Sequence, residues 1–179
     1  AWTTTPWTLP GNVALAVGEK IDYVKVELPD GDKLIIGKDR LDVLKGNPKI
    51  IEKLKGKDLI GLKYEPLYDI KELQNENSHR VIPADFVTTE DGTGIVHMAP
   101  AYGEDDFRIC KSVNIELVDP LDENCIFTSQ VPDFEGQFCK DADKAIIRRL
   151  KDENKIIKHN TVMHSYPFCD RTDTALIYR

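Results

Sequence analysis

The chain is organised around residues 1–12, which have the sequence AWTTTPWTLPGN. Thr and Trp favour strands, and a proline cannot donate to a central ladder, so we predict a strand that ends near Thr5. The sequence PGN at 10–12 is typical of a turn. Four threonine hydroxyls and an indole then crowd at the strand end, where they could hold a polar substrate or a water without a charged side chain. An edge strand with its hydroxyls in solvent fits the same pattern.

The composition is that of one globular domain. The 179 residues suffice for a sizeable core, with 41% hydrophobic and 31% charged residues. No apolar run approaches the roughly 18 residues that span a bilayer, and the first residues do not resemble a signal peptide. Position 1 is not Met, and both ends lie in strand-like sequence. We therefore expect residues 1–179 to be a single domain excised from a longer cytoplasmic protein, and to be monomeric.

Charge and cysteine usage narrow the function classes. The four cysteines are widely spaced without a Cys-x-x-Cys pair, so we expect no zinc or other metal site. Their even number leaves disulfides open, but without a secretory signal we expect free thiols in a reducing compartment. No phosphate-binding loop or dinucleotide fingerprint occurs, so we expect no cofactor in this domain. The net charge of −7 predicts weak intrinsic affinity for nucleic acid.

The hydrophobic pattern predicts a β-rich α+β domain. Helices are expected at 38–45, 103–113 and 140–153. The segment 70–79 is expected to be a loop or a weak helix, and 29–32 the turn of a hairpin. Strands are expected at 13–17, 21–28, 33–37, 48–55, 81–89, 95–98, 115–118, 125–128 and 156–163.

A second motif, GTGIVHMAP at 92–100, is followed by AYGEDDF at 101–107. The strand 95–98 should end at Pro100, and the acidic residues fall in the first turn of the next helix. Ordinary roles fit these residues too. Asp106 could cap the helix, and His97 could be a hydrogen-bonded core residue.

The two motifs together resemble those of the editing domain (CP1, connective peptide 1) of isoleucyl-tRNA synthetases. Pro6-Trp7 points to the isoleucyl branch, because the valyl and leucyl enzymes carry an arginine-proline pair after the threonines. Residues 133–150 most resemble the eukaryotic-type branch. The segment HSYPFC at 164–169 is similar to the return into the catalytic domain, although Asp170 stands where the family usually has Trp.

The resemblance implies a catalytic set. Thr3, Thr4 and Thr5 take the positions beside the ester and its attacking water. Asp106 takes the position that holds the α-ammonium group of the substrate, for which an ionised carboxylate is suited. We expect the helix dipole to keep Asp106 charged at pH 7.

The resemblance also implies a substrate-binding set, to which Asp106 again belongs. Trp7 and Thr8 would line the side-chain pocket, and His97 would help to exclude the larger cognate side chain. Asn12 matches a position linked to editing, although an Asn in a turn would look the same.

The implied function is hydrolysis of valine esterified to tRNA(Ile), within an isoleucine-tRNA ligase whose remaining chain supplies ATP binding and most tRNA affinity. Editing before transfer to tRNA stays an alternative. The implied fold is a barrel-like core of short strands with flanking helices. Rival functions are valyl-type editing, a tRNA-binding module and a structural insertion that has lost editing. The pair His164 and Cys169 lacks a third partner for nucleophilic catalysis.

Overall fold

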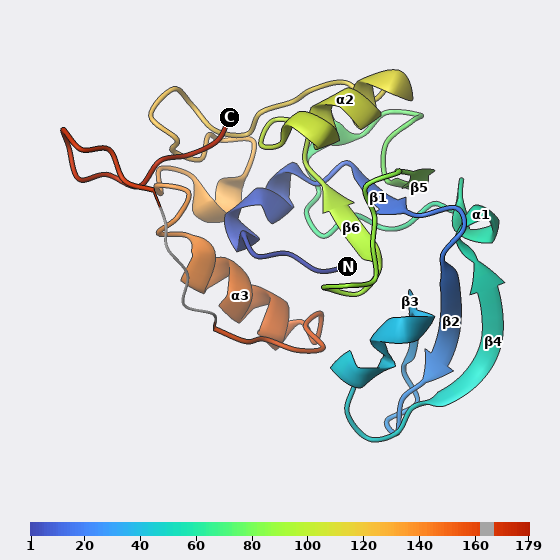
Figure 1. Cartoon of the computed structure of the whole chain (residues 1–179). Helices are drawn as coiled ribbons and strands as arrows, with labels where there is room; N and C mark the ends of the chain where they lie inside the picture. The colour runs from blue at the N-terminus through green and yellow to red at the C-terminus, as the bar shows by residue number, and fades with distance from the viewer. Residues whose placement is uncertain (162–166) are drawn as a thin grey trace.

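Two three-stranded sheets, joined by the short connection from β1 to β2, form the framework of the computed structural model (Figure 1). In the first sheet the order is β5-β1-β6. The central strand β1 (Ala14–Val17) pairs in parallel with β5 (Arg80–Pro83) and antiparallel with β6 (Ile95–Met98). The apolar sequence of β1 fits this central position, because a central strand is covered on both faces.

The second sheet is an antiparallel hairpin with a third strand, in the order β3-β2-β4. β2 (Asp22–Glu27) pairs with β3 (Lys33–Gly37) and with β4 (Lys49–Lys55). The predicted hairpin is confirmed, and the bounds of β3 and β6 agree with the predicted ones. Figure 1 shows this sheet at the lower right of the view, with α2 at the top and α3 at the left.

The helices are short. The α-helices are α1 (Gly56–Leu59), α2 (Glu104–Ser112) and α3 (Asp143–Asp152). The 3-10 helices are η1 (Pro6–Gly11), η2 (Lys38–Val43), η3 (Lys71–Leu73) and η4 (Pro132–Phe134). The structure describes residues 1–161 and 167–179.

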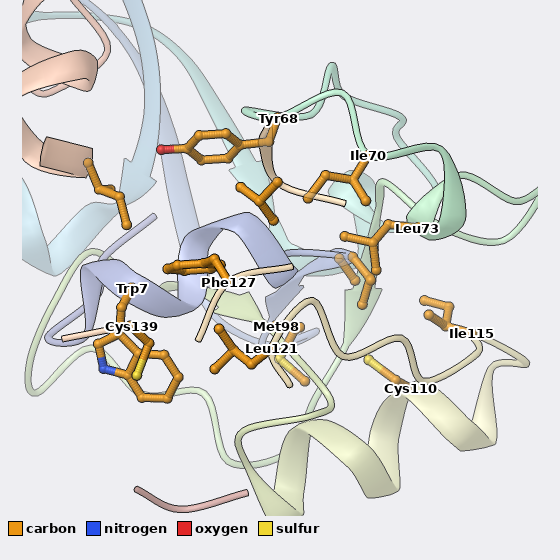
Figure 2. Packing of buried hydrophobic residues seen from close by; sticks show 14 of the residues in the cluster. Trp7, Tyr68, Ile70, Leu73, Met98, Cys110, Ile115, Leu121, Phe127 and Cys139 are labelled. Carbon is orange, nitrogen blue, oxygen red and sulfur yellow. The ribbon is translucent and has the colours of Figure 1, made fainter. Parts of the chain in front are cut away.

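The main core lies around η1 and the first sheet (Figure 2). Trp7 from η1 and Met98 from β6 pack there with Cys110 from α2 and with Phe127 from an irregular segment. The apolar stripe of α3 closes this core, as its predicted pattern indicated. The core therefore fixes η1, β6 and α2 relative to one another.

Several predicted elements are wrong. The strand at 1–5 is reduced to one bridge between Trp2 and Val96, and the PGN turn is the end of the 3-10 helix η1. The helix at 38–45 is the 3-10 helix η2, which ends at Val43. The expected strand 81–89 stops at Pro83, because its partner β1 ends at Val17.

The predicted strands 115–118 and 125–128 are also wrong, because these segments have strand-like sequence but do not pair with a neighbouring strand. Residues 115–118 form a loop after α2, where Ile115 N–H closes back on the helix by donating to Cys110 O. Residues 125–128 make isolated bridges only. The described part of 156–163 has no strand, and residues 162–163 lie outside the described residues.

The α+β, β-rich fold class is confirmed, with the short strands divided between two sheets in the described part of the chain. The four cysteines are free thiols. In the same part of the chain, every helix is too short or too polar to cross a membrane.

Candidate functional site

A pocket of about 230 Å³ lies where the segment before η1, the strand β6 and the start of α2 meet. It is smaller than the roughly 300–1,000 Å³ of pockets that hold drug-sized ligands, so it suits a small group. Its lining residues are Trp2, Thr3, Thr4, Thr5, Thr8, Val96, His97, Ala99, Tyr102 and Asp106. Six of the eight residues expected from the sequence therefore share one pocket.

Trp7 and Asn12 are the two expected residues that do not line it. Trp7 is 4% exposed and lies in the core, with its ring edge against Tyr102 at 4.9 Å between centroids. It thus supports a lining residue from behind. Asn12 is 8% exposed and lies behind His97, with its Nδ2 at 3.1 Å from His97 Nδ1.

Asp106 lies in the first turn of α2, but its side chain does not cap this helix. Its Oδ2 accepts a hydrogen bond from Ala99 N–H at 2.8 Å, in the loop that links β6 to the helix. Gly103 makes room for this arrangement, since a Cβ there would lie 3.2 Å from Asp106 Cγ. The carboxylate therefore joins the loop to the helix and keeps Oδ1 for a ligand.

Burial is the largest cause of the shift in the pKa of Asp106. Burial raises the pKa of Asp106 to about 6, although the Ala99 N–H bond opposes this shift. That the helix dipole keeps Asp106 charged at pH 7 stays a prediction, and burial acts against it. The carboxylate is still mostly ionised at pH 7, since its pKa lies about one unit lower.

His97 is held by a hydrogen bond at each ring nitrogen. Nε2 lies 2.8 Å from Thr8 Oγ1, and Nδ1 lies 3.1 Å from Asn12 Nδ2. The residue is 9% exposed, and burial lowers its pKa to about 4. His97 is therefore a neutral imidazole at pH 7 and contributes a polar, uncharged surface to the pocket.

The hydroxyls of Thr3, Thr5 and Thr8 form a connected cluster, whereas Thr4 lines the pocket outside it. Thr5 N–H donates to Thr3 Oγ1 at 3.1 Å, and Thr8 Oγ1 donates to the Thr5 carbonyl at 2.8 Å. The hydroxyl of Thr5 lies 3.4 Å from that of Thr3 and 3.2 Å from that of Thr8. Pro6 at the start of η1 favours the sharp bend that brings these side chains together.

The sequence did not predict three residues that support the site, namely Tyr102, Asp143 and Tyr64. Tyr102 lines the pocket and donates to Asp119 Oδ1 at 2.8 Å. Asp143 of α3 accepts from Trp7 N–H at 2.7 Å, and Tyr64 donates to Asn12 Oδ1 at 2.6 Å. Tyr102 belongs to the second motif, so its place near the site could have been predicted. Tyr64 and Asp143 lie outside both motifs, and no pattern in the neighbouring sequence links them to the site.

Other expected features lie apart from this pocket. Among the described residues, no three His, Cys, Asp or Glu side chains are grouped so that they could hold a metal ion. Cys169 lines a second pocket near the C-terminal segment. His164, its suggested partner, lies outside the described residues.

The chain is similar to known proteins both in sequence and in structure. No protein-family model matches the chain. In sequence, it is 49% identical over all of its length to isoleucine–tRNA ligase of Bdellovibrio bacteriovorus, and 48% identical over 99% of its length to that of Chlamydia pneumoniae. The chain spans 18% of the length of these relatives.

In structure, the chain resembles a leucyl-tRNA synthetase CP1 domain with a TM-score of 0.70 and 17% identity, over 89% of this chain and 82% of that one. The editing domain of the P. knowlesi cytosolic leucyl-tRNA synthetase gives a TM-score of 0.64 at 14% identity, over 86% and 80%. The fold is thus that of the CP1 editing domains of aminoacyl-tRNA synthetases.

Within that class, the sequence relatives are isoleucine–tRNA ligases, and the similarity covers the whole chain. This supports an isoleucyl-type CP1 domain. The relatives described above are bacterial, so the eukaryotic-type branch stays a prediction.

Proposed function

We propose that this chain is a single editing domain of a longer isoleucyl-tRNA synthetase, of the eukaryotic-type branch, and that it hydrolyses valine esterified to tRNA(Ile). One observation carries the proposal: threonine hydroxyls and one ionised carboxylate share a small pocket in a fold of the CP1 type. The parent protein would be a cytoplasmic monomer, and its remaining chain would supply most of the tRNA affinity, because this domain is acidic.

Asp106 would bind the α-ammonium group of the valyl ester. Its Oδ2 is held by Ala99 N–H, so Oδ1 is presented in a fixed orientation. A charge-assisted hydrogen bond to the ammonium group would stabilise the ester in one position over the threonines. The raised pKa fits a carboxylate that is partly desolvated and gains most from an ammonium partner.

The threonines would position a water for direct attack on the ester carbonyl. The water oxygen bonds to the carbonyl carbon, and the bond from that carbon to the ribose oxygen breaks. Of the two protons of the water, one goes to the ribose oxygen and the other is released to solvent, so that valine leaves as its carboxylate. Positioning supplies most of the rate gain, with hydroxyl donors at the developing oxyanion. The free hydroxyl of the terminal adenosine would assist the proton transfer.

Selectivity would come from the floor of the pocket, where Thr8 and His97 are hydrogen-bonded to each other at 2.8 Å. Both residues are buried and held by further hydrogen bonds, so they would move little to admit the extra methyl group of isoleucine. Trp7 contributes through Tyr102 and not by direct contact. Isoleucine would then be excluded by size.

The test is the substitution Asp106→Asn, with Asp105→Asn as its matched control. The Asn side chain retains an oxygen for Ala99 N–H but carries no charge for the ammonium group. We expect this variant to lose at least about 100-fold in deacylation of Val-tRNA(Ile), as is typical for loss of a charged hydrogen bond. Asp105 is exposed, and its variant should keep full activity.

Deacylation is measured for Val-tRNA(Ile) and Ile-tRNA(Ile) with the purified chain, and the fold of each variant is checked by circular dichroism. The wild type should cleave the valyl ester and spare the isoleucyl ester. Full activity of Asp106→Asn would refute the ammonium role. Binding of tRNA by the wild type without any hydrolysis would favour the alternative of a tRNA-binding module.

A further inference from the structure

A series of hydrogen bonds, buried at its centre around His97, leads from Tyr64 outside the pocket to the threonines inside it. Tyr64 lies in the segment after α1 and is not among the residues that line the pocket. Its hydroxyl donates to Asn12 Oδ1 at 2.6 Å, and Asn12 Nδ2 lies 3.1 Å from His97 Nδ1. His97 Nε2 then lies 2.8 Å from Thr8 Oγ1. A residue that does not line the pocket is thus linked to the threonine cluster.

The orientation of the Asn12 amide is fixed by its neighbours. Nδ2 faces the carbonyl oxygens of Ala14 at 2.9 Å and Met98 at 3.4 Å, which can only accept. Oδ1 faces the Tyr64 hydroxyl, which can donate. Exchange of the amide oxygen and nitrogen would place Oδ1 against two acceptors. Asn12 Nδ2–H therefore donates to His97 Nδ1.

This donation selects one tautomer of His97. A ring nitrogen that accepts carries no proton, so the neutral imidazole has its proton on Nε2 and donates to Thr8 Oγ1. The proton of Thr8 is directed to the Thr5 carbonyl at 2.8 Å. The remaining lone pair of Thr8 faces the Thr5 hydroxyl at 3.2 Å. The donors Tyr64, Asn12 and His97 therefore point along the series toward Thr8, and the Thr5 hydroxyl donates to Thr8 from the pocket side.

The direction of the series gives two pocket hydroxyls different roles. Thr5 directs its proton to Thr8, so its oxygen is left as an acceptor. Thr3 Oγ1 accepts from Thr5 N–H at 3.1 Å, and its own proton is available to the Thr5 hydroxyl oxygen 3.4 Å away or to a ligand in the pocket. An attacking water needs an acceptor for its proton, and the ester carbonyl needs a donor for its developing charge.

We propose that Tyr64 and Asn12 are positioning residues, which hold His97 as the Nε2–H tautomer and thereby orient Thr5 as acceptor for the water and Thr3 as donor to the carbonyl. The catalytic consequence rests on the proposed function, whereas the hydrogen-bond direction does not. Tyr64 and Asn12 do not touch the ester and act through His97 and Thr8.

Histidine ¹⁵N NMR of the chain tests the tautomer directly, because protonated and unprotonated ring nitrogens have distinct shifts. We expect His97 of the wild type to be protonated at Nε2 and unprotonated at Nδ1. In Tyr64→Phe, Asn12 Oδ1 loses its donor while Nδ2 keeps the Ala14 and Met98 carbonyls, so the His97 shifts are expected to move toward those of a mixture of tautomers. The kcat for Val-tRNA(Ile) should fall about fivefold at unchanged KM, which corresponds to one lost hydrogen bond.

The matched control is Tyr68→Phe. The Tyr68 hydroxyl is also buried but has no hydrogen-bond partner among the described residues, so its removal should leave the His97 shifts and kcat unchanged. Protonation of wild-type His97 at Nδ1 would overturn the proposal. Wild-type shifts and kcat in Tyr64→Phe would overturn the role of Tyr64. If the wild type cleaves no ester, the proposed function fails, and the NMR result still decides the hydrogen-bond direction.

Discussion

At the scale of single residues, the site combines one partly desolvated carboxylate with a neutral histidine. Burial shifts the two groups in opposite pKa directions, upward for Asp106 and downward for His97, because it disfavours the charged form of each. The pocket consequently has one ionised side chain at pH 7 that can select an ammonium group. Its other polar lining groups are neutral.

The raised pKa of Asp106 predicts a stability effect with a defined sign. Its folded-state pKa of about 6 exceeds the ordinary 3.8, so its contribution to stability is full below pH 3.8 and is lost as the pH rises through 6. Asp106→Asn should therefore raise the Tm at pH 7.5 by about 2–4 °C, equivalent to roughly 1 kcal/mol after allowance for solvent screening. At pH 4 the difference should vanish.

Thermal unfolding at the two pH values checks this prediction, with Asp105→Asn as the control. A variant that is less stable than the wild type at pH 7.5 would show that the bond to Ala99 outweighs the cost of burying the charge. The same substitution is expected to slow deacylation at least about 100-fold, so stability and activity would change in opposite directions at this position.

At the scale of elements, η1 contains Thr8 of the pocket, and α3 holds η1 in place. Asp143 Oδ1 accepts from Trp7 N–H at 2.7 Å, and Trp7 packs on Tyr102, which lines the pocket. Thr8 is the next residue along η1. A helix more than 130 residues away in sequence therefore sets the position of the threonine cluster.

Asp143→Ala should destabilise the chain by about 1–3 kcal/mol, because the buried Trp7 N–H loses its acceptor. It should also slow deacylation, since η1 then holds Thr8 less firmly. Urea unfolding measures the first effect. Asp141→Ala removes an exposed carboxylate just before the same helix and should change neither quantity. Equal urea midpoints for the two variants would contradict the proposed link.

At the scale of the whole molecule, the two sheets meet where α1 follows β4. Gly56 N–H donates to Ile21 O at 3.0 Å, and Lys57 N–H donates to Glu19 O at 3.1 Å. A Cβ at Gly56 would lie 1.9 Å from the Gly18 carbonyl oxygen. Glycine is therefore needed there for the close approach of two backbone segments.

We expect Gly56→Ala to cost about 2–3 kcal/mol in the free energy of unfolding, because backbone must shift to admit the methyl group. Lys57→Ala, at the adjacent exposed position, should cost less than about 0.5 kcal/mol. Chemical denaturation compares the two variants. A Gly56→Ala protein as stable as the wild type would mean that the backbone near Gly18 and Gly56 can shift without a cost in the free energy of unfolding.

Much of the fold could be predicted where the chain decides it locally. The hairpin of β2 and β3, the strand β6 and the amphipathic α3 follow from periodicity and turn residues. The segments 115–118 and 125–128 have strand-like composition but no partner strand, and pairing is not visible in a local pattern.

By itself, the sequence determined the chemistry of this protein: which hydroxyls, imidazole and carboxylate it has, and which motifs contain them. Only the tertiary structure decided that the two motifs share one pocket, that Trp7 and Asn12 stand behind it, and that Tyr64 and Asp143 hold it in place. The pKa of Asp106 also belongs to this second group. The reason is physical. Residue types and turn preferences act over a few positions, whereas burial and hydrogen-bond partners depend on segments that meet only when the chain folds.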